Sequence, residues 1–254
     1  MHSQSALQRI FGPASQAFKT YWAAILAFQL MALAVVLCYY WVDGSAEIFA
    51  RIAEFKQGAG LVFAAISTLF SGGVIPEIFK FFIRPKDQPT PSVGELGHQL
   101  LMWAWLGVLV DLFYRLQTHL FGEQVNWQSL LIKTSFDQLV FTPLVTIPLI
   151  VSWFMLREVH YNPAAFIKQL HPGNVGRRLL PVWATSLIFW PVTLMIVYAL
   201  PPVLQFPLYL FANAAFSILM IFILRRPELT EDSAGQQAAE AGPDAFQAPS
   251  EELR

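Results

Sequence analysis

Residues 21–41 read YWAAILAFQLMALAVVLCYYW, a run of apolar and aromatic side chains with no charged residue. At ~1.5 Å of rise per helical residue, such a run covers the roughly 30 Å hydrocarbon core of a bilayer. Five further apolar stretches follow, at 58–79, 100–121, 139–156, 179–200 and 206–224. The predicted fold class is therefore all-α, a polytopic transmembrane helical bundle of about six membrane helices.

The basic residues indicate an orientation. With six crossings, eleven Lys and Arg residues flank the helices on the side that carries both termini, and only three lie on the other side: Arg51, Lys56 and Lys133. Positive charge near helix ends is retained on the cytoplasmic side or its equivalent. We therefore expect both termini on the inside face.

The composition predicts three regions. Residues 1–45 form an N-terminal extension with the first membrane helix, 46–226 a helical membrane domain, and 227–254 an acidic tail. Only 13% of the residues are charged and 56% are hydrophobic, which suits lipid as the surrounding partner. The tail is rich in Ala, Gln, Gly, Pro and acidic residues and is predicted to be disordered. The net charge of −1 predicts that the protein does not bind nucleic acid. A homo-oligomer remains one of the possible assemblies.

Few chemical motifs are present. The single Cys38 excludes an intramolecular disulfide and a cysteine metal cluster, and the five histidines lack ligand spacing. We find no H-E-x-x-H, P-loop or G-x-S-x-G pattern, so no catalytic residue, metal site or cofactor is predicted. The basic stretch before residue 21 is either a lead-in to the first helix or a short targeting segment.

Ionisable residues inside the apolar stretches are the best candidates for function, because each is costly to place in lipid. Asp111, Arg115 and His119 lie four residues apart on one helix face, and the first two can pair. The alternative is an ion pair that only keeps the helix end polar. Glu77 follows Pro76, with Lys80 one turn on. This pattern predicts either a kinked helix that lines a wet cavity or a helix end with an interfacial pair.

The fourth stretch begins with a polar cluster. Lys133 and Asp137 have i,i+4 spacing, and Gln138 follows. We expect Asp137 at the N-terminal end of helix 139–156, where the helix dipole favours a carboxylate. Pro143 lies inside this helix. In the fifth stretch, Trp190-Pro191 predicts a mid-helix break, and Pro201-Pro202 predicts a tight turn between the last two helices.

This cluster resembles a known family. The run K-T-S-F-D-Q-L-V-F-T-P at 133–143 matches the K-x-x-x-D-Q-x-x-F-x-P stretch of the Mpv-seventeen family, which includes the twenty-two-kilodalton peroxisomal membrane protein. Trp190-Pro191 and Pro202 repeat that family's W-P and later P at the same separation. Phe113-Tyr114 stands where the family has a Trp-Tyr pair. The motif residues are Lys133, Asp137, Gln138, Phe141, Pro143, Trp190, Pro191 and Pro202.

The resemblance covers about residues 46–226 and is dense from Lys133 to Pro202. It departs from the family at Val197-Tyr198, where the family has Asn-Phe, at Phe206 in place of an Arg, and at Gly72-Gly73 in place of Gly-Asp. These departures fit a distant member. A location in a mitochondrial or peroxisomal membrane is implied, or in a bacterial inner membrane for a bacterial branch.

The resemblance implies a compact membrane protein with channel-like permeability to small solutes. Two alternatives stay open: a non-conducting structural or assembly factor of the membrane, and a membrane-embedded enzyme. In the channel interpretation, the candidate polar lining residues are Glu77, Asp111, Arg115, Asp137 and Gln138.

Overall fold

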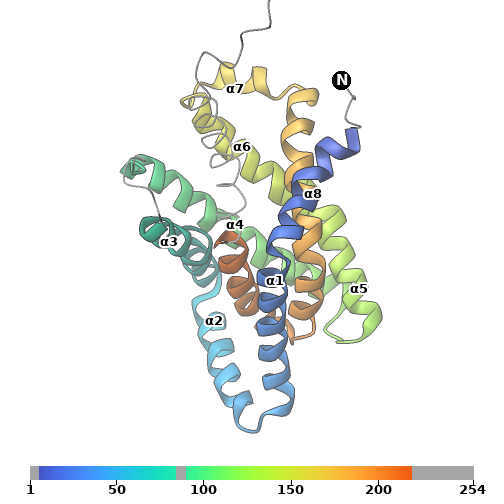
Figure 1. The fold of residues 1–254 in the computed structure, drawn as a ribbon. Helices are drawn as coiled ribbons and strands as arrows, with labels where there is room; N and C mark the ends of the chain where they lie inside the picture. Colours follow the sequence, from blue (N-terminus) through green and yellow to red (C-terminus); the bar gives the residue numbers. More distant parts are fainter. Residues whose placement is uncertain (1–5, 84–89, 219–254) are drawn as a thin grey trace, which may run out of the picture.

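A computed structural model describes residues 6–83 and 90–218, and every regular element in these two ranges is helical (Figure 1). The all-α prediction is therefore confirmed for this part of the chain. The predicted disordered tail, 227–254, lies outside the described residues.

Five helical segments are long and apolar enough to cross a membrane, which indicates an integral membrane protein. The first is Trp22–Trp41 within α1 (Ala6–Trp41), and the second is Ser45–Phe82. The others are α4 (Val93–Phe121), Trp127–Glu158, and Val175–Tyr198 within α8 (Pro172–Tyr198). In the described residues the sixth apolar stretch forms a shorter helix, Pro202–Ile218.

Two of the spans contain π-helical turns. The second span joins α2 (Ser45–Thr68), η1 (Leu69–Val74) and α3 (Ile75–Ile83). The fourth joins α5 (Trp127–Phe136), η2 (Asp137–Thr146) and α6 (Ile147–Glu158). A short helix, α7 (Pro163–Gln169), then leads to α8. Wide π turns are frequent at functional sites.

Two sequence expectations about helix boundaries are wrong. The fourth span begins at Trp127, after an N-cap in which the Asn126 side chain accepts a hydrogen bond from the Ser129 N–H at 2.9 Å, and not at residue 139. The predicted break at Trp190-Pro191 is also absent, because α8 continues to Tyr198. In lipid the backbone has no water to bond, so a continuous helix is favoured even where a proline removes one donor.

The helix also does not end at Pro76. Pro76 is the second residue of α3, so its missing N–H falls close to the junction with the π turns of η1. The irregularity lies one turn earlier, in η1, where the buried Gly72 and Gly73 face α4. A Cβ at Gly72 would overlap the Trp103 ring, so these glycines allow α4 to approach closely.

The elements pack around one main buried core, and Ile25 and Phe189 form a small second cluster. In Figure 1, α1 lies along α8, and α2 lies against α4. The helix Pro202–Ile218 turns back on α8, as Pro201-Pro202 predicts: the Trp190 and Tyr209 rings stack with centroids 5.8 Å apart, and Phe189 and Phe216 are 5.0 Å apart. α4 packs mainly against α2 and η1, with further contacts to the fourth span.

Candidate functional site

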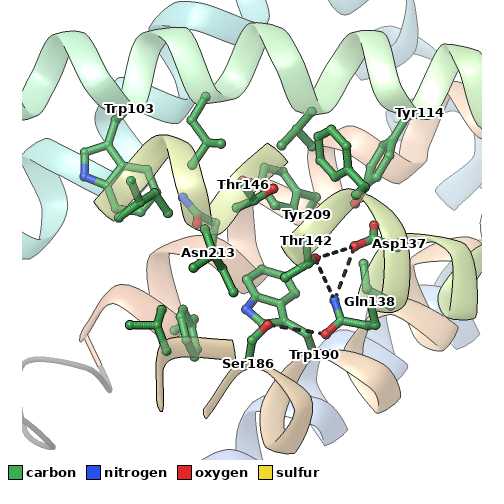
Figure 2. A pocket seen from close by; sticks show the side chains of 18 residues that line it. Trp103, Tyr114, Asp137, Gln138, Thr142, Thr146, Ser186, Trp190, Tyr209 and Asn213 are labelled. Carbon is green, nitrogen blue, oxygen red and sulfur yellow. Dashed lines mark hydrogen bonds between the residues drawn. The ribbon is translucent and has the colours of Figure 1, made fainter. Parts of the chain in front are cut away.

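A cavity of about 100 Å³ lies among α4, the η2–α6 segment, α8 and the helix Pro202–Ile218 (Figure 2). We call it the Asp137 cavity. Its walls are mainly apolar and aromatic, with Trp103, Phe141 and Trp190 among them. Its polar groups come from Asp137, Gln138, Thr142, Thr146, Ser186 and Asn213. A volume of this size exceeds what one water molecule needs.

Asp137 is 7% exposed and accepts hydrogen bonds from three neutral groups. The Tyr198 hydroxyl donates to Oδ2 at 2.7 Å. The Thr142 hydroxyl and the Gln138 amide donate to Oδ1 at 3.1 and 3.2 Å. In the part of the chain that the structure describes, no basic side chain forms an ion pair with this carboxylate. Its charge is therefore balanced only by dipoles.

The expected environment of Asp137 differs from the observed one in two respects. Asp137 lies ten residues after the start of the span Trp127–Glu158, so the N-terminus of this helix does not support it. Lys133 does not pair with it either, because the Lys133 ammonium donates to the Gly122 carbonyl at 2.8 Å. The turn between α4 and α5 brings that carbonyl within reach of the lysine, which spacing along one helix could not show.

The hydrogen bonds extend from Asp137 to α4 and α8. Gln138 Oε1 accepts from the Ser186 hydroxyl at 3.3 Å, and the Gln138 carbonyl accepts from the Trp183 indole at 2.9 Å. Tyr198, which donates to Asp137, accepts from the Gln117 amide at 3.0 Å. Tyr198, Gln117 and Ser186 were not predicted as site residues. A polar side chain within an otherwise apolar helix is the signal that could have found Gln117 and Ser186.

A second cavity of about 350 Å³ also has Tyr114 in its wall and is bordered by α2, α4 and the turn at Pro202. We call it the Lys56 cavity. Its wall carries two cationic side chains, Lys56 and Arg115, and the polar side chains of Gln57 and Thr118. No acidic residue lines it among the described residues.

Both cations pair with Asp111, which is fully buried at 0% exposure. The Arg115 guanidinium contacts Oδ2 through Nε and Nη2, each at 2.8 Å, so the predicted pair is confirmed. The Lys56 ammonium lies 3.0 Å from Oδ1 and is a second partner that the sequence did not indicate. Because Asp111 is buried, the alternative interpretation, in which the ion pair only keeps the helix end polar, does not describe this cluster fully.

Tyr114 lines both cavities. The residue is 3% exposed, and its hydroxyl has no hydrogen-bond partner among the described residues. Figure 2 shows the side chain reaching from α4 toward the region of Asp137. Tyr114 is therefore shared by the linings of the two cavities.

The remaining candidates are distributed more widely. Glu77 pairs with Lys80 at 2.7 Å and lines neither cavity. Phe141 stacks on Phe113 with ring centroids 3.8 Å apart, and Pro143 lies inside η2. Pro202 borders the Lys56 cavity, whereas Pro191 borders neither. Within residues 6–83 and 90–218, no group of His, Cys, Asp and Glu side chains could hold a metal ion.

Four motif residues thus meet at one place: Asp137, Gln138, Phe141 and Trp190 line the same cavity. The functional assignment has to rest on this geometry. No protein-family model, curated protein or solved structure matches the chain.

Proposed function

We propose that this integral membrane protein is channel-like and lets small solutes cross the bilayer along α4. One observation carries the proposal: the Asp137 and Lys56 cavities share Tyr114 and together follow α4 from Trp103 to Thr118. That length of helix rises about 22 Å. It amounts to most of the roughly 30 Å core that a solute must cross.

The polar groups along this route support the proposal. A carboxylate inside a membrane segment costs about 2.5–3.5 kcal/mol on insertion scales, and such residues commonly mark solute or ion pathways. Asp137 has no cationic partner among the described residues, so it keeps the capacity to bind a passing solute. In this proposal Tyr114, which borders both cavities, is the gate, and a change of its rotamer would join them.

The proposal includes a membrane topology, a family and a membrane location. The helix Pro202–Ile218 would complete a sixth crossing, with both termini inside. The shared motifs favour distant membership of the Mpv-seventeen family, with pore-like permeability in a mitochondrial, peroxisomal or bacterial inner membrane.

A second function is favoured by a different observation. The three donors to Asp137 come from two helical spans, and the bonds continue to Gln117 on a third. Such a network could serve only to fix helix packing, as in a non-conducting structural or assembly factor.

Flux through reconstituted liposomes tests the channel proposal. We expect the wild type to pass small solutes faster than protein-free liposomes, with a cut-off at larger size. Tyr114→Ala removes the gate and should raise the flux. Leu116→Ala is the matched control, because Leu116 is an exposed side chain on the same helix. Tyr114→Leu is a milder change if the alanine variant folds poorly.

The proposal fails if wild-type flux equals the protein-free background for every solute. It also fails if folded Tyr114 variants pass no more solute than Leu116→Ala.

A further inference from the structure

The Lys56 cavity carries an unbalanced charge. Two cationic side chains, Lys56 and Arg115, contact one carboxylate, Asp111, and no other acidic side chain of the described residues lies within ion-pair distance of either. Lys56 is only 8% exposed. The cluster therefore has a formal charge of about +1, and one of its two cations, Lys56, is largely shielded from water.

We infer that this cavity binds an oxyanion, either a carboxylate or a phosphate, supplied as a free solute or as a lipid headgroup. The anion would neutralise the excess charge that Asp111 leaves. A volume of about 350 Å³ is at the lower end of the range for small-molecule sites.

The wall offers hydrogen-bond donors as well as charge. The Lys56 ammonium has three N–H donors and the Arg115 guanidinium five, more than Asp111 occupies. Hydrogen bonds from such cations to an oxyanion are among the strongest in proteins.

The backbone at Gly60 adds to this wall. Gly60 has φ 55° and ψ −132°, which breaks the helical path of α2, and open space lies where a Cβ would stand. Gly60 borders the cavity together with Lys56.

The position of the cavity allows access from the membrane surface. Arg115 precedes the end of α4, Phe121, by about 9 Å of helix. Its side chain is 57% exposed. Both a dissolved anion and the phosphate of a lipid can reach such a depth, and the experiment separates these sources.

Binding is measured on the purified full chain, in detergent for soluble anions and in nanodiscs for lipids, so the result does not depend on solute flux. Calorimetry with sodium phosphate and with sodium acetate, at ionic strength held constant with sodium chloride, tests free oxyanions. Native mass spectrometry of nanodiscs with and without phosphatidylglycerol, against phosphatidylcholine alone, tests retention of an anionic headgroup.

Arg115→Gln is the main variant, since it leaves a neutral Lys56–Asp111 pair. It should weaken oxyanion binding about tenfold or more. Asp111→Asn should strengthen binding by removing the competing carboxylate. Arg178→Gln is the matched control, because Arg178 forms an exposed pair with Glu158 outside both cavities.

Binding of phosphate or acetate that Arg115→Gln weakens and Arg178→Gln retains supports a free-solute site. Selective retention of phosphatidylglycerol with the same dependence supports a headgroup site. The inference is overturned if neither probe binds, or if Arg178→Gln loses as much binding as Arg115→Gln. If Asp111→Asn does not fold, Arg115→Gln with its control Arg178→Gln still decides the matter.

Discussion

Two buried aspartates in this protein are stabilised in different ways. Asp111 contacts two cations, Lys56 and Arg115. Asp137 accepts only from the neutral groups of Tyr198, Thr142 and Gln138. Cationic partners offset the free-energy cost of burying a carboxylate. A buried carboxylate that only neutral donors contact remains available to a cation or a polar solute.

The Asp111 cluster gives a prediction about stability. Lys56→Met should lower the free energy of unfolding by roughly 1–3 kcal/mol, because it removes a buried partner of a buried charge. Arg115→Gln should cost less, about 0–1 kcal/mol, since the Arg115 side chain is largely exposed. Thermal unfolding in detergent measures both.

A double variant provides the control for this prediction. Lys56→Met combined with Asp111→Asn should cost less than the sum of the two single changes, because neither charge is then left alone. Additive effects would show that Lys56 and Asp111 do not interact.

At the scale of elements, continuous helices with π turns replace the breaks that the proline pattern predicts. The sequence places the start of the fourth helix after Gln138, because polar residues interrupt the apolar run there. The structure keeps these residues helical, since Lys133 bonds to the Gly122 carbonyl and Asp137 to Tyr198. Partners that lie distant along the chain, such as Tyr198, cannot be found from local hydropathy.

The crossing of α2 and α4 depends on one glycine. A Cβ at Gly107 would overlap the Ala64 carbonyl and the Thr68 side chain. Gly107→Ala should therefore lower the free energy of unfolding by about 1–3 kcal/mol, through overpacking. A thermal melt in detergent checks this.

Gly97 on the same helix is the matched control. Open space surrounds the place where its Cβ would stand, so Gly97→Ala should leave stability unchanged or raise it by up to about 1 kcal/mol. Equal losses in both variants would show that the close crossing at Gly107 is unimportant.

At the scale of the whole molecule, the hydropathy pattern was sufficient to predict an all-α membrane protein. The positions of the basic residues predict which face of the membrane each loop lies on. The turn containing Gln124 and the segment containing Ala164 should lie on opposite faces of the membrane. In a Cys38→Ala background, Gln124→Cys should react with an impermeant thiol reagent from outside. Ala164→Cys should react only after the inner face is opened. Labelling of both from one side would contradict the proposed topology.

The sequence identified part of the candidate site. Asp137, Gln138 and Trp190 were expected and line one cavity, and the Asp111–Arg115 pair was expected and forms. Lys56 was not expected, because it lies among charged residues typical of an interfacial helix. That Tyr114 borders both cavities depends on three-dimensional packing alone. Glu77 was expected in a lining and lies outside both cavities.

The most direct test measures solute flux and thermal stability on the same preparations of wild type and Asp137→Asn. Asparagine keeps the size and hydrogen-bonding capacity of the side chain but removes its charge. The channel account predicts wild-type flux above protein-free liposomes, and a changed preference between cationic and anionic solutes in Asp137→Asn with little loss of folded protein. Wild-type flux at the protein-free background, with Asp137→Asn altering only stability, would contradict this account and favour a packing role.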